Sequence, residues 1–318
     1  MSKPEISVII ANYNRADMIE ASLESVLNQD FDRFEVIVSD DGSTDHSLKV
    51  IEKFKDRITV VTGYNGGCAL ARTRGIFIAR GEFIAIHDSD DIMLQGRLQA
   101  QSQFMKKHHD VAAVTGNLVM SNDESRNYLR TVGVDFKDKS HVIFDRPIKI
   151  FANRSIMADP ATMLRKRVFE TVGGYDCALP VSADWDLWLR IARRWSMGCM
   201  DTPCTWYRVH DGNKSASPLR IATLIRIMEK NLSSKDRLED DAHKLLTERL
   251  YNTLIEYVRI NTNRPFDEDW RGRVRFHARH LPRQKRGILC TLSAVPKSVA
   301  KAGIDNKKAI RTFLSRFL

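Results

Sequence analysis

Three carboxylates lie within four residues in the segment Asp88-Ser89-Asp90-Asp91, which follows an apolar run at residues 83–86. Like charges this close repel one another unless a cation or hydrogen-bond donors lie among them. Oxygen ligands favour Mg²⁺ or Mn²⁺, and proteins typically hold Mg²⁺ through one or two carboxylates together with substrate phosphates. The segment is therefore a candidate metal site. The alternative interpretation is a solvated turn whose aspartate caps a helix.

Two further segments combine glycine with polar side chains. In Asp40-Asp41-Gly42-Ser43-Thr44-Asp45, a carboxylate could accept a hydrogen bond from the N–H of a pyrimidine ring, but the segment could also be only a turn and a helix cap. In Asn65-Gly66-Gly67, the glycines allow close backbone approach before a predicted helix whose N-terminus favours phosphate, and Arg72 and Arg74 could add positive charge. The chain has no GxGxxG or GxxxxGK[ST] motif, so the dinucleotide and P-loop classes lack their signatures.

An acid and a histidine later in the chain are candidates for the same site. Asp184 and Asp186 stand two positions apart at a predicted helix start, so they cannot share one helical face, and at most one should point into a pocket. Such a carboxylate could act as a general base, or it could only complement the helix dipole. His210 ends the segment Tyr207-Arg208-Val209-His210 and would be an acceptable metal ligand beside the carboxylates. Its alternative interpretation is a structural histidine.

The first ninety or so residues alternate between strand and helix patterns. Short runs of apolar and β-branched residues predict a buried strand at residues 6–10 and further strands at residues 34–38, 58–62 and 83–86. Helical spacing predicts helices between them, including residues 17–28 and 68–79. This alternation implies right-handed crossovers and a largely parallel sheet, on which ligands bind at the carboxyl ends of the strands. Polar clusters follow three of these strands, at residues 11–15, 40–43 and 88–91, so we expect them to converge on one edge of the sheet.

The rest of the chain is predicted more coarsely. Residues 111–119 are predicted to form another strand, residues 184–195 a helix, and residues 121–150 a polar, irregular loop over the site. Helical patterns dominate from residue 219 to about residue 260, and we expect an α/β domain over residues 1–215 and a helical extension over residues 216–318.

Composition and charge limit the classes that the chain can belong to. Hydrophobic residues make up 43% of the 318 residues and charged residues 28%, which excludes a wholly disordered chain, a collagen-like fibre and a disulfide scaffold. Five scattered cysteines without a CxxC pair indicate a reducing compartment and argue against a zinc ribbon. Neither a signal peptide core nor a run of about 20 apolar residues is present, so a cytoplasmic protein is expected.

The net charge of +10 belongs to the end of the chain. Residues 271–318 hold 13 basic side chains and a single acid, whereas residues 1–218 are nearly neutral. Basic residues beside short apolar runs, including the closing segment Phe313-Leu314-Ser315-Arg316-Phe317-Leu318, would suit peripheral attachment to an anionic surface at the inner face of the cytoplasmic membrane. The alternative is a solvated helical face. Nucleic acid is not an expected partner, because the segment has few aromatic residues to stack on bases and no known motif.

Taken together and in order, these motifs resemble glycosyltransferase family 2, the inverting enzymes of the GT-A fold, over about residues 5–215. The resemblance implies a nucleotide-diphosphate-sugar donor, with a UDP-sugar expected, and Mn²⁺ or Mg²⁺ as the cofactor. It also implies a saccharide or lipid-linked saccharide acceptor of the kind used in cell-surface polysaccharide synthesis. By the same resemblance, the residues for nucleotide-sugar binding are Asn12, Tyr13, Arg15, Asp41, Gly66, Arg72 and Asp90. The metal ligands would be Asp88, Asp90, Asp91 and His210, and the catalytic base would be Asp184.

The chain departs from the family pattern at three positions. Ala11, Thr73 and Ala183 stand where the family commonly has Pro, Asn and Glu. The last departure removes an acid beside the expected base. Two other classes stay open: a sugar-phosphate nucleotidyltransferase, whose Gly-rich N-terminal loop is not found here, and a non-enzymatic binding module led by the basic end of the chain.

Overall fold

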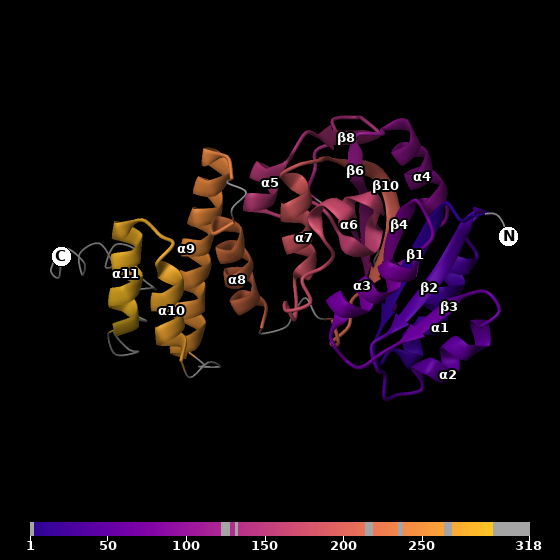
Figure 1. Ribbon diagram of the computed structural model, residues 1–318, viewed down its shortest axis with the longest axis horizontal. Helices are drawn as coiled ribbons and strands as arrows, with labels where there is room; N and C mark the ends of the chain where they lie inside the picture. Colours follow the sequence, from indigo (N-terminus) through magenta and orange to yellow (C-terminus); the bar gives the residue numbers. More distant parts are fainter. Residues whose placement is uncertain are drawn as a thin grey trace. The chain divides into compact units, whose positions relative to one another are not determined.

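A computed structural model of the chain describes residues 3–121, 128–130, 133–213, 219–234, 238–263 and 269–294. The chain divides into two compact units, residues 1–217 and residues 218–318. The first unit combines a sheet with helices, and the described part of the second unit is helical (Figure 1). The closing segment at residues 313–318, predicted to help attach the chain to an anionic surface, lies outside the described residues.

One sheet organises the first unit, with its main path in the order β3-β2-β1-β4-β9-β6-β10-β5, while β7 pairs with β6 and β8 with β10. Its strands are β1 (Ile6–Asn12), β2 (Phe34–Asp40), β3 (Thr59–Thr62), β4 (Phe83–Asp88), β5 (Ile92–Met93), β6 (Val111–Ser121), β7 (Tyr128–Arg130), β8 (His141–Phe144), β9 (Thr162–Arg165) and β10 (Ser196–Arg208). The first four strands are mutually parallel, β6 and β10 are also parallel, and β9 runs antiparallel between β4 and β6. This arrangement confirms the predicted α/β class.

Helices cover both faces of the parallel strands, as the nearly continuous apolar runs of these strands require. The helical segments of the first unit are α1 (Ala16–Leu27), α2 (Ser47–Ile51), η1 (Glu52–Phe54), α3 (Cys68–Ile78), α4 (Arg97–Lys107), α5 (Ile148–Asn153), η2 (Asp159–Ala161), α6 (Arg167–Val172) and α7 (Ala183–Ala192). Val8 and Ile10 pack with apolar residues of α1 and α4, whereas the alternate residue Ile9 faces α3. Gly75 permits that close approach, because a Cβ there would lie 2.8 Å from the Ile9 side chain.

The region predicted as an irregular loop is partly regular. Within residues 121–150, β7 pairs with β6 and β8 pairs with β10, and α5 begins at Ile148. The prediction was wrong for these elements because they are short, and strands of three or four residues give too little alternation to identify from periodicity. Their stability comes from pairing with longer strands that are distant in the sequence.

The second unit contains four described helices: α8 (Arg220–Leu232), α9 (Asp240–Asn263), α10 (Trp270–Ala278) and α11 (Arg283–Ala294). Their apolar faces pack together, with Leu246, Leu250 and Leu254 fully buried at four-residue intervals along α9. Among the described residues, no helix combines the length and the apolar character that crossing a bilayer requires.

Candidate active site

The register of the parallel strands brings the predicted polar clusters to one edge. Asn12 at the end of β1 lies opposite Asp40 at the end of β2, and its neighbour Ala11 lies opposite Asp88 at the end of β4. The chain then continues beyond each strand into the segments that carry the candidate residues. The predicted convergence is therefore confirmed for the segments that follow β1, β2 and β4.

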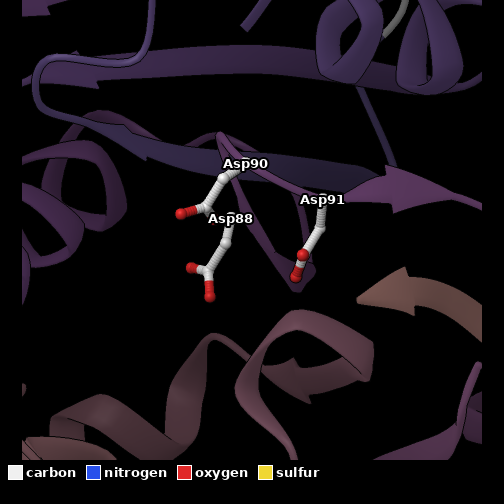
Figure 2. A group of neighbouring side chains, drawn as sticks. All are labelled: Asp88, Asp90 and Asp91. Carbon is white, nitrogen blue, oxygen red and sulfur yellow. The ribbon is translucent and has the colours of Figure 1, made fainter. Parts of the chain in front are cut away.

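The acidic turn after β4 places three carboxylates together. One oxygen from each of Asp88, Asp90 and Asp91 lies within 4.8 Å of the others, and the three side chains project from the same turn (Figure 2). Asp91 is fully buried. Its Oδ1 accepts a hydrogen bond of 3.1 Å from the Arg208 backbone N–H, while its Oδ2 has no hydrogen-bond partner among the described residues. Burial, with the charges of Asp88 and Asp90, raises the pKa of Asp91 well above its ordinary value.

Two positively charged or protonatable side chains meet at Asp90. Arg15, which follows β1, donates from Nε to Asp90 Oδ2 at 3.0 Å, and His210 Nε2 lies 3.2 Å from the same oxygen. Arg15 also donates to the Gly212 carbonyl at 2.8 Å. These contacts join the loop after β1, the acidic turn and the segment after β10, so His210 lies beside the carboxylates although it is 120 residues from Asp90 in the sequence.

This donor set fits a divalent cation. Carboxylate oxygens with one imidazole are ligands that Mn²⁺ accepts, and Mg²⁺ would take the oxygens. The buried Asp91 Oδ2 supports the fit, because a buried carboxylate oxygen without a donor is costly unless a ligand completes it. Asp88, Asp90 and Asp91 could hold such an ion, and His210, whose Nε2 lies 3.2 Å from Asp90 Oδ2, could add an imidazole ligand.

The segment after β2 orders the glycine pair. Asp40 is buried and accepts hydrogen bonds from Asn12 Nδ2 at 2.9 Å and from the Ser43 backbone N–H at 2.9 Å. Asp41, only 2% exposed, accepts from the backbone N–H groups of Gly66 at 3.0 Å and Gly67 at 2.7 Å. The two aspartates therefore have different roles, because Asp40 closes its own turn while Asp41 holds the loop before α3.

Three further residues lie in the segment after β1, on α3 and directly before α3, and the first of them, Tyr13, is predicted to bind the nucleotide sugar. Tyr13 is partly buried directly after β1. Arg74 donates to the Asp40 carbonyl at 3.1 Å, which ties α3 to the end of β2. Gly67 has φ of +90°, a backbone conformation in which glycine is favoured. The base-contacting and phosphate-contacting roles expected of Tyr13, Asp41 and Gly66 stay predictions.

The two acids at the start of α7 point to different surroundings. Asp186 is fully buried and pairs with Arg190 on the same helix, with Oδ2 to Nε at 2.9 Å. Asp184 instead interacts electrostatically with Arg72 and Asp88. Burial and the Asp88 charge raise the pKa of Asp184, while Arg72 acts in the opposite direction. The carboxylate expected to be the base therefore shares an electrostatic environment with the acidic turn.

Sequence reasoning missed two buried residues of this site, Asp159 and Tyr175. Arg72 donates to Asp88 Oδ1 at 2.6 Å and to Asp159 Oδ2 at 2.5 Å, and the Tyr175 hydroxyl donates to the same Asp159 oxygen at 2.9 Å. A base or phosphate contact for Arg72 stays a prediction, since its guanidinium lies between two carboxylates. One indirect signal existed: Arg72 lies on the inner side of a short helix, and a buried arginine needs acidic partners.

Arg97 was also missed. It is fully buried beneath this edge and donates to the Ile86 carbonyl at 2.8 Å and to the Thr205 hydroxyl at 3.0 Å. Burial lowers its pKa to about 10, although the charges of Asp91 and Asp88 act in the opposite direction. The side chain thereby links β4 to β10, the strands that precede the acidic turn and His210.

Residues 7–173 match Glycosyl transferase family 2. The chain belongs to this family. Among its curated relatives is the E. coli UDP-Glc:alpha-D-GlcNAc-diphosphoundecaprenol beta-1,3-glucosyltransferase WfaP, 32% identical over 225 residues that cover 68% of this chain and 81% of the relative. This family 2 chain is therefore a glycosyltransferase.

Solved structures show the same fold. The S. aureus TarS fragment 1–349 in complex with UDP-GlcNAc has a TM-score of 0.69 at 19% identity, covering 98% of this chain and 92% of that one. The mannosyltransferase PcManGT from Pyrobaculum calidifontis, in complex with GDP-Man and Mn²⁺, has a TM-score of 0.55 at 16% identity, covering 95% and 87% of the two chains. The expected GT-A fold with C-terminal helices is thereby confirmed.

Proposed function

We propose that the chain moves a sugar from a UDP-sugar to an acceptor hydroxyl, with inversion and with the help of Mn²⁺ or Mg²⁺. The observation that carries the proposal is the electrostatic interaction of Asp184 with Asp88, which supports a candidate base close to a candidate metal site although the two residues lie far apart in the sequence. The fold alone would not suffice, because function depends on the site.

The charges of the site suit this reaction. Asp88, Asp90, Asp91 and His210 would hold the divalent ion, and such an ion, when bound, would supply positive charge against the charge that develops on the leaving diphosphate. Asp184 would remove the proton from the acceptor hydroxyl while its oxygen attacks the anomeric carbon. The sugar–phosphate bond breaks in the same displacement, its electron pair leaves on the diphosphate oxygen, and the configuration inverts without a covalent link to the protein.

The donor and acceptor classes draw support from the related proteins. The name of WfaP specifies a UDP-glucose donor and a diphosphoundecaprenol-linked acceptor, and TarS binds UDP-GlcNAc. We infer a UDP-sugar donor and a saccharide or lipid-linked saccharide acceptor for this chain as well. Asn12, Tyr13, Arg15, Asp41, Gly66, Arg72 and Asp90 remain the proposed contacts to the donor.

An assay of released nucleotide tests the reaction. Purified protein is incubated with UDP-sugars, Mn²⁺ and a lipid-linked saccharide acceptor, and UDP release is measured. The variant Asp184→Asn should lose about 10²–10⁴-fold in transfer while its affinity for UDP stays within about twofold, because a base acts on the acceptor proton. Asp186→Asn removes the other acid of α7 and serves as the matched control.

Each alternative class gives a different result in this assay. A nucleotidyltransferase would release no UDP from these substrates but would release pyrophosphate when given a nucleoside triphosphate and a sugar phosphate, and a binding module would release neither product. Near-normal turnover by the Asp184→Asn variant would remove Asp184 from the role of base.

We also propose that the second unit attaches peripherally to an anionic membrane surface at the inner face of the cytoplasmic membrane. Residues 270–294 contain no acid, and Arg273, Phe276 and Arg279 follow one another at three-residue spacing along α10 and its end. Phe276 is 53% exposed, and the Arg279 guanidinium lies 3.7 Å from the centroid of its ring. An exposed aromatic ring between two arginines suits the boundary between headgroups and acyl chains.

Vesicle sedimentation tests the attachment. The triple variant Arg273→Glu, Phe276→Ser, Arg279→Glu should bind vesicles of anionic phospholipid at least about 30-fold more weakly, since each basic residue near the surface contributes about 1 kcal/mol. Lys49→Glu with Lys55→Glu makes the same charge change in the first unit and should leave binding nearly unchanged. Equal sedimentation of the triple variant and the wild type would reject the attachment.

A further inference from the structure

Arg72 is held at both ends of its guanidinium by carboxylates from different parts of the fold. It lies on α3, is only 8% exposed, and donates through Nη2 to Asp88 at 2.6 Å and through Nη1 to Asp159 at 2.5 Å. Both contacts join a guanidinium to a carboxylate and so belong to the stronger, charge-assisted class of hydrogen bond. The position of Arg72 therefore depends on Asp159 as much as on Asp88.

Asp159 and Tyr175 form the fixed side of this arrangement. Asp159 belongs to η2, immediately before β9, and is 3% exposed. Tyr175 is 5% exposed and donates its hydroxyl to Asp159 Oδ2, and the Arg72 guanidinium lies 5.5 Å from the centroid of the Tyr175 ring. Arg72 thus contacts a carboxylate at one edge of its guanidinium and an aromatic ring nearby, both from rigid, buried surroundings.

The single positive charge of Arg72 acts on three carboxylates. Besides its hydrogen bonds to Asp88 and Asp159, it interacts electrostatically with Asp184. Burial raises the pKa of Asp159 to about 7, with Asp184 and Asp88 adding to the effect and Arg72 opposing it. The guanidinium is therefore shared between the acidic turn and the candidate base.

We propose that Asp159 and Tyr175 are positioning residues, which hold Arg72 so that it orients the Asp88 carboxylate toward the metal site and faces Asp184 with a fixed positive charge. The proposal rests on the proposed function. Neither positioning residue needs to touch the substrate, because both act through Arg72.

The variant Asp159→Asn tests this role, since it keeps the side-chain shape and removes the charge. We expect kcat to fall at least about tenfold, and calorimetry should show Mn²⁺ binding in the presence of UDP weakened at least about threefold. The UDP-sugar KM should change less than kcat. Asp186→Asn breaks a comparable buried acid–arginine pair on α7 and should leave Mn²⁺ binding unchanged.

A double-mutant cycle with Arg72→Met separates positioning from direct action. If Asp159 acts through Arg72, Asp159→Asn should cause little further loss of Mn²⁺ binding or kcat in the Arg72→Met background. An equal fold-loss in both backgrounds would overturn the proposal and indicate that Asp159 acts on the substrate itself. Unchanged kcat and unchanged Mn²⁺ binding in the single variant would also overturn it.

Tyr175→Phe provides a milder test if Asp159→Asn fails to fold. It keeps the ring near the guanidinium and removes only the hydroxyl donor. We expect Tyr175→Phe to lower kcat and the affinity for Mn²⁺ about twofold to fivefold, and this loss should disappear in the Arg72→Met background. A loss that persists there would overturn the proposal. A wild-type protein that binds Mn²⁺ with UDP but transfers no sugar would refute the proposed function, and the calorimetric cycle would still decide this inference.

Discussion

Replacing Asp91 by asparagine should stabilise the metal-free protein and should also prevent it from gaining stability with Mn²⁺ and UDP. Asp91 is fully buried, and its Oδ2 has no hydrogen-bond partner among the described residues. Oxygens of Asp88 and Asp90 lie within 4.8 Å. Asparagine keeps an oxygen that can accept from the Arg208 backbone N–H and removes the buried carboxyl, whose ionised form burial and the neighbouring carboxylates disfavour.

The magnitude follows from the distances. Two unit charges about 5 Å apart at an effective dielectric constant of about 20 repel by roughly 3 kcal/mol. Nearby guanidiniums offset part of this repulsion, since Arg72 pairs with Asp88 and Arg15 pairs with Asp90. A net gain of about 2 kcal/mol in the free energy of unfolding is therefore expected for the metal-free variant, which corresponds to roughly 4–8 °C in Tm for a unit of about 200 residues.

Saturating Mn²⁺ with UDP should reverse the order of stability. A ligand at about 100 times its Kd stabilises the native state by about 2.7 kcal/mol, and the wild type should gain this while the variant gains little. Scanning calorimetry in EDTA and then in Mn²⁺ with UDP measures both effects. A Tm for the variant below that of the wild type in EDTA, or an equal gain from Mn²⁺ with UDP, would refute the reasoning. Asp186→Asn is the control, because it leaves the paired Arg190 without its carboxylate and should destabilise the protein equally in both buffers.

Two other predictions concern the base and the glycine loop. Burial, with the Asp88 charge, raises the pKa of Asp184, and a base must be ionised. Transfer should therefore fall as the pH is lowered, with a midpoint above the ordinary aspartate value of about 3.9. A profile of kcat/KM from about pH 3.5 to 9 measures this midpoint, and a midpoint at the ordinary value would contradict the prediction. Gly67→Ala should destabilise the protein by about 1–3 kcal/mol and weaken UDP binding, because φ is +90° and the Gly67 N–H holds Asp41. Gly287→Ala is the control, because a new Cβ there would also meet nothing within 4 Å but the residue lies within the helix α11. A thermal-shift measurement should show this variant to be as stable as the wild type or more stable. Equal behaviour of the two variants would exclude backbone strain at Gly67.

The parallel half of the sheet could be predicted from the sequence because its strands β1, β2 and β4 are short runs dominated by apolar residues. The run at residues 34–38 became β2, Phe34–Asp40, and the run at residues 83–86 became β4, Phe83–Asp88. Parallel pairing then requires the ends of these strands to meet, so the convergence of the Asp40 and Asp88 segments follows from topology alone.

The connection between Arg72 and Asp159 could not be predicted in the same way. It depends on β9, a four-residue antiparallel strand between β4 and β6 that positions η2 beside the end of β4. Such a short strand has no readable period, and the two residues are 87 positions apart. The contact of His210 with Asp90 joins residues 120 positions apart, so the sequence offered His210 as a candidate ligand, but only the resemblance to a family placed it in the same site.

The buried carboxylates of this chain differ in how the fold compensates their charge. Asp186 pairs with Arg190, and Asp159 pairs with Arg72 and accepts from Tyr175. Asp91 is buried at least as deeply but accepts its hydrogen bond from a backbone N–H, beside two further carboxylates. An uncompensated cost of this kind usually marks a functional site, because nothing in folding alone favours it. The carboxylates of the acidic turn thus destabilise the metal-free protein at the point where a divalent cation would neutralise them. This arrangement is the reason why the Asp91→Asn variant should be more stable than the wild type in EDTA and less stable than the wild type with Mn²⁺ and UDP.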